Sequence, residues 1–263
     1  MTSQSTHHGS LLVESWLEAG RHLIRWRRDR AVLMGSLLFP IFLLLLYQIV
    51  LGEQLHRATG VDSIYGLVPF CAVLSALFGS LGNAVGITMD RQAGLLTRMW
   101  VLPVHRASAL TGRLVAEATR ALVGTLLITL LGVFLGLRFT HGWATVLLYV
   151  LIPSIMVVGY TTLLMALVIR TNGRTIMTWL VGGTVTLAFV NPATTPVQSF
   201  PKALQPWIHI QPLSPPIETM RSLAYGGPIV LPLAMTFLWA IVLVAVFAPL
   251  AIRGYRRAAE SSA

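Results

Sequence analysis

Residues 90–113 of this chain read DRQAGLLTRMWVLPVHRASALTGR, a charged stretch between two long apolar runs. The stretch contains four apolar side chains at the spacing i, i+1, i+4, i+5, namely Leu95, Leu96, Met99 and Trp100. This spacing places them on one face of a helix. Arg98 borders that face, and Pro103 ends the helix because proline cannot continue a helical turn. The stretch predicts a short amphipathic helix at a membrane surface. It either binds a soluble partner and passes force to the flanking helices, or only rests on lipid.

The rest of the chain is strongly apolar. Hydrophobic residues make up 55% of the 263 residues and charged residues only 11%, against about a quarter charged in soluble domains. The apolar residues form runs of roughly 18 or more, the length that crosses a bilayer as a helix. We therefore expect an all-α integral membrane protein, with one six-helix transmembrane domain over residues 31–263. The expected spans are residues 31–51, 64–89, 114–137, 143–169, 175–192 and 228–252, the fifth being the shortest and interrupted by Gly182-Gly183.

Residues 1–30 precede the first expected span and predict a cytoplasmic tail followed by an interfacial amphipathic helix. Trp16 and Trp26 can face lipid there, while Arg21 and Arg25 reach anionic headgroups. The alternative is a basic stretch that only orients the chain.

Arginine is concentrated on one side of the expected membrane. The arginine-rich segments are the N-terminal segment, residues 90–113, residues 170–174 and the C-terminal tail. The opposite segments carry only Arg57, Arg138, Lys202 and Arg221. Because positively charged loops stay in the cytoplasm, we expect a multi-pass protein of the plasma membrane with both termini inside.

The long outer segment before the last span, residues 193–227, is rich in proline and yet apolar. We expect short re-entrant helices there, since irregular backbone at membrane depth must be covered by protein or water. One of them should start at Pro216 and end at Tyr225, with Gly226-Gly227 as its cap. This segment predicts an outer lid whose candidate residues are Trp207, Pro212, Glu218 and Arg221, the last two forming a local ion pair. The alternative is an interfacial flap without a gating role.

The sequence offers no motif for enzyme chemistry. Its one lysine, Lys202, follows proline, whereas a phosphate-binding P-loop needs Gly-Lys before Ser or Thr. The acidic residues are scattered, and the one cysteine, Cys71, lies in an apolar run. We expect no catalytic residue, metal or cofactor in this chain. We also expect no nucleic-acid partner, because the basic residues lie at the ends of apolar runs.

One charged pair lies inside an expected span. Glu117 and Arg120 are three residues apart on the third span and can neutralise each other. Because Arg113 is only one to two turns away, we expect a structural pair near the membrane interface. The alternative is a proton-coupling site, since ionisable groups deep in a bilayer are typical of ion-coupled transport.

These features resemble the membrane subunit of type-2 ATP-binding-cassette exporters, specifically the daunorubicin-resistance permease group of actinobacteria. The similarity covers nearly the whole chain. It is most specific around the coupling helix of the family, where relatives have a Glu-Arg-Glu type start and this chain has Asp90-Arg91-Gln92. The similar residues are 94–98, 102–106 and 112–113 in the loop, and 211–214, 221 and 226–228 in the outer segment.

The resemblance implies that a separately encoded ATPase subunit binds ATP and magnesium and pushes on the loop. The implied coupling residues are Gln92, Gly94, Leu95, Leu96, Arg98, Met99, Trp100, Pro103 and Arg106. It also implies a second permease chain, identical or related, and export of hydrophobic or amphipathic compounds, such as anthracycline drugs or cell-envelope lipids. We expect such substrates to contact spans one, two and five, with membrane lipids around the bundle. The alternatives are an ion-coupled secondary transporter and a non-transporting membrane scaffold.

Overall fold

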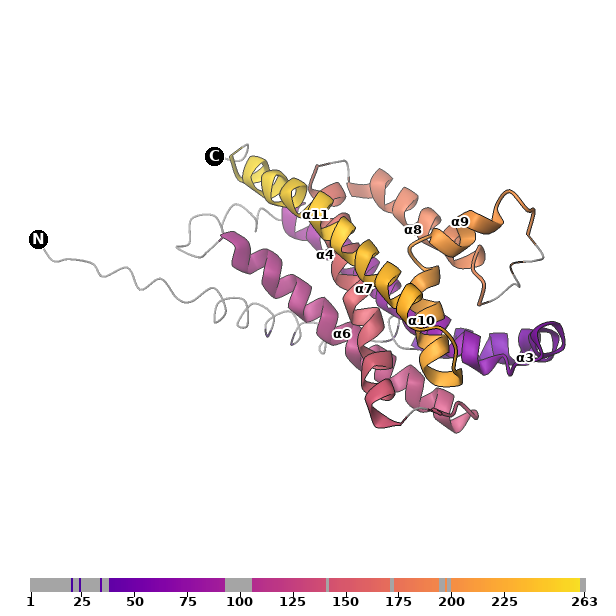
Figure 1. Cartoon of the computed structure of the whole chain (residues 1–263). Helices are drawn as coiled ribbons and strands as arrows, with labels where there is room; N and C mark the ends of the chain where they lie inside the picture. Colours follow the sequence, from indigo (N-terminus) through magenta and orange to yellow (C-terminus); the bar gives the residue numbers. More distant parts are fainter. Residues whose placement is uncertain are drawn as a thin grey trace, which may run out of the picture.

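The computed structural model describes Gly20, Ile24, Met34 and residues 38–92, 106–140, 142–170, 173–193, 197 and 200–260. The described part of the chain is helical and contains no strand (Figure 1), which confirms the all-α class. Its helices are α3 (Phe39–Thr59), α4 (Ile64–Gln92), α6 (Arg106–Phe134), α7 (Trp143–Arg170), α8 (Gly173–Phe189), α9 (Gln205–Ile210), α10 (Ser214–Tyr225) and α11 (Val230–Glu260).

Four of these helices are long and apolar enough to cross a membrane. Their spanning parts are Ile64–Gly86 in α4, Thr111–Phe134 in α6, Ala144–Ile169 in α7 and Val230–Gly254 in α11. They coincide with the second, third, fourth and sixth expected spans. A shorter apolar helix, Thr175–Phe189 within α8, lies where the fifth was expected. The chain is therefore a multi-pass membrane protein.

α3 and α8 each differ from what the apolar pattern predicts. α3 continues beyond residue 51 to Thr59, because Glu53 and Arg57 form an exposed ion pair one turn apart and extend the helix into a polar region. It ends at Gly60, whose φ of 68° requires the left-handed region that glycine tolerates. α8 is not interrupted at Gly182-Gly183, since a glycine within a helix costs only about 1 kcal/mol and does not by itself break it.

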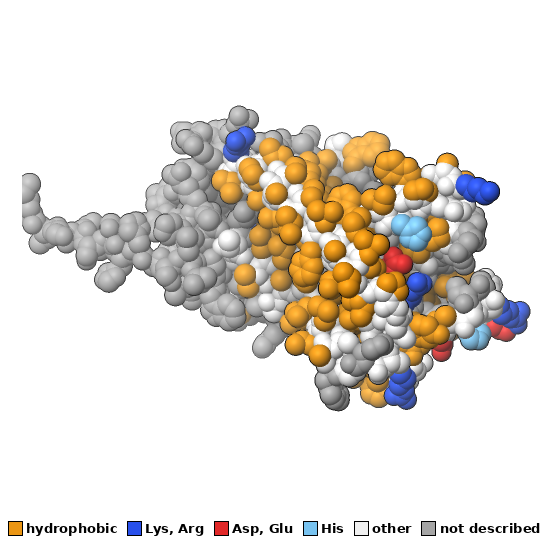
Figure 2. Space-filling model, viewed as in Figure 1, with side chains coloured by type: hydrophobic (Ala, Val, Ile, Leu, Met, Phe, Trp, Pro, Cys, Tyr) orange, Lys and Arg blue, Asp and Glu red, His pale blue; other side chains and the backbone are white. Residues whose placement is uncertain are grey.

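α4 lies at the centre of the bundle and α11 at its edge. Of the spanning part of α4, 89% is buried inside the protein, against 22% for α11. α4 packs against α3, α6, α7, α8 and α10, and in Figure 1 α6, α7 and α11 run alongside it in the same oblique direction. Apolar side chains cover most of the face shown in Figure 2, with charged ones mainly toward its ends, as expected for a surface in contact with lipid.

α9 and α10 form a helical hairpin that closes one end of the bundle, which we call the hairpin end. α10 packs against α4, α7 and α11, and Gly226 and Gly227 follow it with φ of 109° and 135°, so the predicted short helix and its glycine end are confirmed. Nε1 of Trp239 donates a hydrogen bond of 2.7 Å to the carbonyl of Ile210. Because Trp239 lies about 14 Å along α11 from its start, the end of α9 contacts α11 well away from the start of that helix.

Candidate functional site

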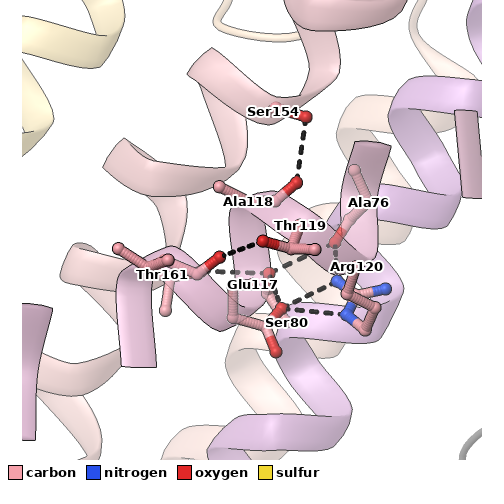
Figure 3. Close-up of polar contacts among 9 residues, drawn as sticks. Ala76, Ser80, Glu117, Ala118, Thr119, Arg120, Ser154 and Thr161 are labelled. Atoms are coloured by element: carbon pink, nitrogen blue, oxygen red, sulfur yellow. Dashed lines mark hydrogen bonds and ion pairs between the residues drawn. The ribbon is translucent and has the colours of Figure 1, made fainter. Parts of the chain in front are cut away.

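The site begins with two charged side chains of α6 that face the centre of the bundle. Nη2 and Nε of Arg120 lie 2.7 Å and 3.1 Å from Oε2 of Glu117. The two residues are 4% and 5% exposed. The structure thus contains the ion pair expected from their spacing, and the pair is shielded from solvent by the surrounding helices (Figure 3).

The depth of this pair follows from where the spanning part of α6 begins. The spanning part of α6 begins at Thr111, three residues before the expected 114, so Arg120 lies about 14 Å along it. The pair is therefore well inside the bundle, deeper than the interfacial position that its distance from Arg113 suggested. At this depth an unpaired charge would cost several kcal/mol, which explains why the two charges lie together.

Two hydroxyl groups connect the carboxylate of Glu117 to the neighbouring helices (Figure 3). Oγ of Ser80 on α4 lies 3.0 Å from Oε2 of Glu117, and Oγ1 of Thr161 on α7 donates to Ser80 at 3.0 Å. The hydroxyl of Ser80 has a single proton, and the backbone carbonyl one turn earlier in α4 is also within its reach. The carboxylate of Glu117 is the stronger acceptor of the two. Proton donation therefore runs from Thr161 to Ser80 to Glu117. We call Ser80, Glu117, Arg120 and Thr161 the Glu117 cluster.

The guanidinium of Arg120 also binds the backbone of α4. Its Nη2 donates to the carbonyl of Ala76 at 2.8 Å, and a methyl group added at Gly79 would overlap the guanidinium. Gly82 and Gly86, which share the helical face of Gly79, have open space instead. The absence of a side chain at Gly79 thus makes room for Arg120.

These contacts join three helices at one level of the bundle. Oγ of Ser154 on α7 adds a 3.1 Å hydrogen bond to the carbonyl of Ala118 on α6. The cluster is neutral in sum and its members are buried, so it can hold α4, α6 and α7 together. Among the described residues no group of three or more His, Cys, Asp or Glu side chains could hold a metal ion.

The predicted coupling loop lies mostly outside the described residues. Gln92 is the last residue of α4 and Arg106 the first of α6, and these two helices pack against each other. The other predicted coupling residues, Gly94, Leu95, Leu96, Arg98, Met99, Trp100 and Pro103, are not described. The loop therefore joins two helices that the Glu117 cluster ties together.

The predicted lid residues do not form one unit. Trp207 on α9 is 72% exposed, whereas α10 is buried against the bundle except at Glu218, Arg221 and Tyr225. Pro212 lies in the turn between the two helices. Within the described residues no ion pair joins Glu218 and Arg221, and the side chain of Arg221 is exposed.

Sequence reasoning found Glu117 and Arg120 but missed their partners. Ser80 and Thr161 are single hydroxyl residues in apolar helices, and such residues most often bond to their own helix. Gly79 lies against the Arg120 side chain, a contact that the sequence around Gly79 does not indicate. Only the packing of α4, α6 and α7 brings these residues together.

The sequence matches the family described as ABC-2 type transporter over residues 15–225. It is 35% identical over 248 residues to a probable doxorubicin resistance ABC transporter permease protein, DrrC, of Mycobacterium tuberculosis, covering 94% of this chain and 90% of that protein. It is 26% identical to a putative transport permease, ycf38, of Cyanophora paradoxa, over 77% of this chain and 71% of that protein. A daunorubicin resistance ABC transporter permease protein, DrrB1, of Streptomyces coeruleorubidus is 21% identical over 97% of this chain and 88% of its own length.

Proposed function

Because this chain belongs to the ABC-2 type transporter family and is a permease subunit whose ATP is bound by a partner chain, we propose that it exports hydrophobic or amphipathic compounds. Its relatives from Mycobacterium and Streptomyces are named for resistance to doxorubicin and daunorubicin. An anthracycline drug is therefore the first substrate to test, and a cell-envelope lipid the second. Because the chain belongs to a family of ATP-driven permeases, we no longer consider the two alternatives of the sequence analysis, an ion-coupled secondary transporter and a non-transporting scaffold.

The observation that carries the mechanism is that the Glu117 cluster joins the two helices that flank the 93–105 loop. We infer that the partner ATPase binds this loop and displaces it when the ATP-bound subunits close. α4 and α6 follow because the loop connects them directly, and α7 follows through Thr161 and Ser80. A ligand on one chain then shifts the equilibrium between two arrangements of another.

The path for the substrate is proposed to lie along α8, between this chain and a second permease chain. α8 packs against α4 and α7 on one side. Its other side carries an exposed row that is small or polar in the middle and aromatic near its ends, which we call the open face: Thr175, Trp179, Gly182, Thr186 and Phe189. Small residues in membrane helices favour close approach of another helix. The open face therefore suits a second permease chain better than lipid alone.

We also propose how the chain is oriented in the membrane. α3 and α8 would complete six spans together with α4, α6, α7 and α11, with both termini and the 93–105 loop in the cytoplasm of a plasma-membrane protein. The hairpin end would then face outward. Since α10 is packed into the bundle, we assign the lid role only to α9 and the residues before it.

The coupling assignment can be tested by making the loop helix polar. We expect Leu95→Asp combined with Met99→Asp to weaken the attachment of the ATPase by on the order of 1,000-fold, because two buried apolar anchors of about 2 kcal/mol each add to about 4 kcal/mol at such contacts. The measurement is co-purification of the ATPase in mild detergent, followed by ATP-dependent uptake of doxorubicin into inside-out proteoliposomes.

Thr97→Asp is the matched control, because residue 97 lies on the opposite face of the same predicted helix. It should leave both co-purification and uptake near the wild-type level. Wild-type uptake by the Leu95/Met99 double variant at equal expression would overturn the coupling assignment. Uptake of a fluorescent lipid but not of doxorubicin would move the substrate to the lipid class.

A further inference from the structure

Three consecutive residues of α7 contact three different neighbours. Thr161 donates to Ser80 and so belongs to the Glu117 cluster. Gly159 lies against α11, where a methyl group added to it would be 3.1 Å from the backbone of Ala240. Tyr160 points toward α8, and its hydroxyl lies 2.5 Å from Oγ1 of Thr184. One turn of α7 thus contacts α4, α8 and α11.

The direction of the bond between Tyr160 and Thr184 follows from the other partner of Thr184. Oγ1 of Thr184 donates to the carbonyl of Leu180 at 2.7 Å, which uses its only proton. Tyr160 is therefore the donor and Thr184 the acceptor. Thr184 is only 4% exposed, so water does not compete for this bond.

The ring of Tyr160 reinforces the same connection. It packs against both of the larger apolar clusters of the bundle, the one near α10 and the one where α4, α7 and α8 meet at the opposite end. At its far end α8 is attached differently, because Nε2 of Gln211 in the hairpin turn donates to the carbonyl of Val190. Tyr160 thus holds the middle of α8 and Gln211 holds its end.

We propose that Tyr160 is a positioning residue that makes α8 follow α7 during transport. This inference rests on the proposed function, in which the open face of α8 borders the substrate path. When α4 and α6 are displaced, the Glu117 cluster carries α7 with them, and the adjacent Tyr160 carries α8. Without the hydroxyl of Tyr160, α8 keeps its apolar contacts but is no longer held in one position relative to α7.

The test uses the complete complex of permease and ATPase in proteoliposomes and the variant Tyr160→Phe, which removes only the hydroxyl. We expect ATP hydrolysis to continue while doxorubicin transported per ATP falls by roughly 3- to 20-fold, the factor that corresponds to measured strengths of hydrogen bonds between membrane helices. Thr184→Val should produce the same loss. The double variant should be no worse than either single variant, because both remove one interaction.

Tyr149→Phe is the matched control. Tyr149 lies on the same helix and is fully buried, but its hydroxyl has no hydrogen-bond partner among the described residues. The same chemical change there should leave transport per ATP unchanged. If Tyr160→Phe and Tyr149→Phe only reduced the amount of folded protein, both would have a lower thermal stability. ATP hydrolysis and doxorubicin transport would then fall together, and the ratio between them would not change.

A second readout does not depend on the substrate. Spin labels at Leu147 on α7 and Val181 near the middle of α8, both exposed and outside the open face, report the distance between these helices in the nucleotide-free and vanadate-trapped complexes. In the wild type we expect one narrow distance that is the same in both states, and in Tyr160→Phe a broad or state-dependent one. Wild-type transport per ATP with a narrow, constant distance in Tyr160→Phe would overturn the inference. If doxorubicin is not transported at all, the proposed drug fails, and the distance measurement alone decides for or against Tyr160.

Discussion

The interior of the bundle and its hairpin end are held together by different chemistry. At the level of the Glu117 cluster, a buried ion pair and two hydroxyl groups join α4, α6 and α7. At the hairpin end, α10 is held by apolar side chains such as Ile217, Met220 and Leu223, each at most 2% exposed. A weak contact of 3.4 Å between the hydroxyls of Thr219 and Thr236 adds little.

The difference indicates how much displacement each of the two regions can tolerate. A charged cluster fixes the relative positions of its members, since a shift leaves a charge without its partner in a medium of low dielectric constant. Apolar packing inside a membrane is less specific, because lipid tails are as apolar as the side chains they would replace. We therefore expect the three helices of the cluster to move as one body, and the hairpin end to allow small displacements.

The largest effect should come from breaking the ion pair. Arg120→Leu leaves the carboxylate of Glu117 buried and unpaired, which should cost about 3–5 kcal/mol. The measurement is the thermal unfolding of detergent-solubilised protein together with the folded yield. Replacing both Glu117 and Arg120 by Leu should recover part of the loss, because no charge is then left alone.

Arg57→Leu is the control for this change. Arg57 and Glu53 form an ion pair on α3 with both side chains more than 70% exposed, so water solvates the remaining charge. We expect no measurable change in the thermal unfolding of Arg57→Leu. Equal losses for Arg57→Leu and Arg120→Leu would show that burial of the Glu117 cluster does not set its importance.

A smaller effect is expected from a cavity at the hairpin end. Met220→Ala empties a fully buried position of α10 and should cost about 2–5 kcal/mol, the range for removing a large buried side chain. Trp207→Ala on the exposed α9 should change stability little, although it removes more side-chain atoms. If Trp207→Ala proved the more destabilising of the two, α9 rather than α10 would hold the hairpin in place.

The smallest effect distinguishes two glycines of α4. Gly79→Ala places a methyl group where the Arg120 guanidinium lies, and should cost about 1–3 kcal/mol as an overpacked site. Gly82→Ala meets open space and should be neutral or slightly stabilising, since alanine favours the helix. Comparable unfolding temperatures for the two variants would contradict the assignment of Gly79 as the space for Arg120.

Much of the fold could be predicted from local patterns. Runs of apolar residues predicted the spanning parts of α4, α6, α7 and α11 to within a few residues at each end. This is because length and hydropathy alone decide whether a segment can cross a bilayer. The glycine pair at 226–227 placed the end of α10. The spacing of Glu117 and Arg120 predicted their ion pair, because residues three apart on a helix are neighbours.

The partners of that pair could not be predicted in the same way. Ser80, Thr161 and Tyr160 show no periodicity, and each could have bonded to its own helix or faced lipid. Their roles depend on which helices are adjacent, and adjacency is decided by contacts between residues far apart in the chain. The helical continuity at Gly182-Gly183, in contrast, needs no such neighbour, because glycine alone does not break a helix.

By itself, the amino-acid sequence determined that this chain crosses a membrane several times, and that it carries a charged pair inside one span and a charged loop between two spans. Only the tertiary structure decided that α4 is central while the more apolar α11 lies at the edge. The physical reason is that a membrane removes the usual link between hydrophobicity and burial: lipid accepts an apolar surface as readily as a neighbouring helix does. Close packing around Gly79, Gly159 and the Glu117 cluster, rather than hydropathy, therefore selects which helices meet.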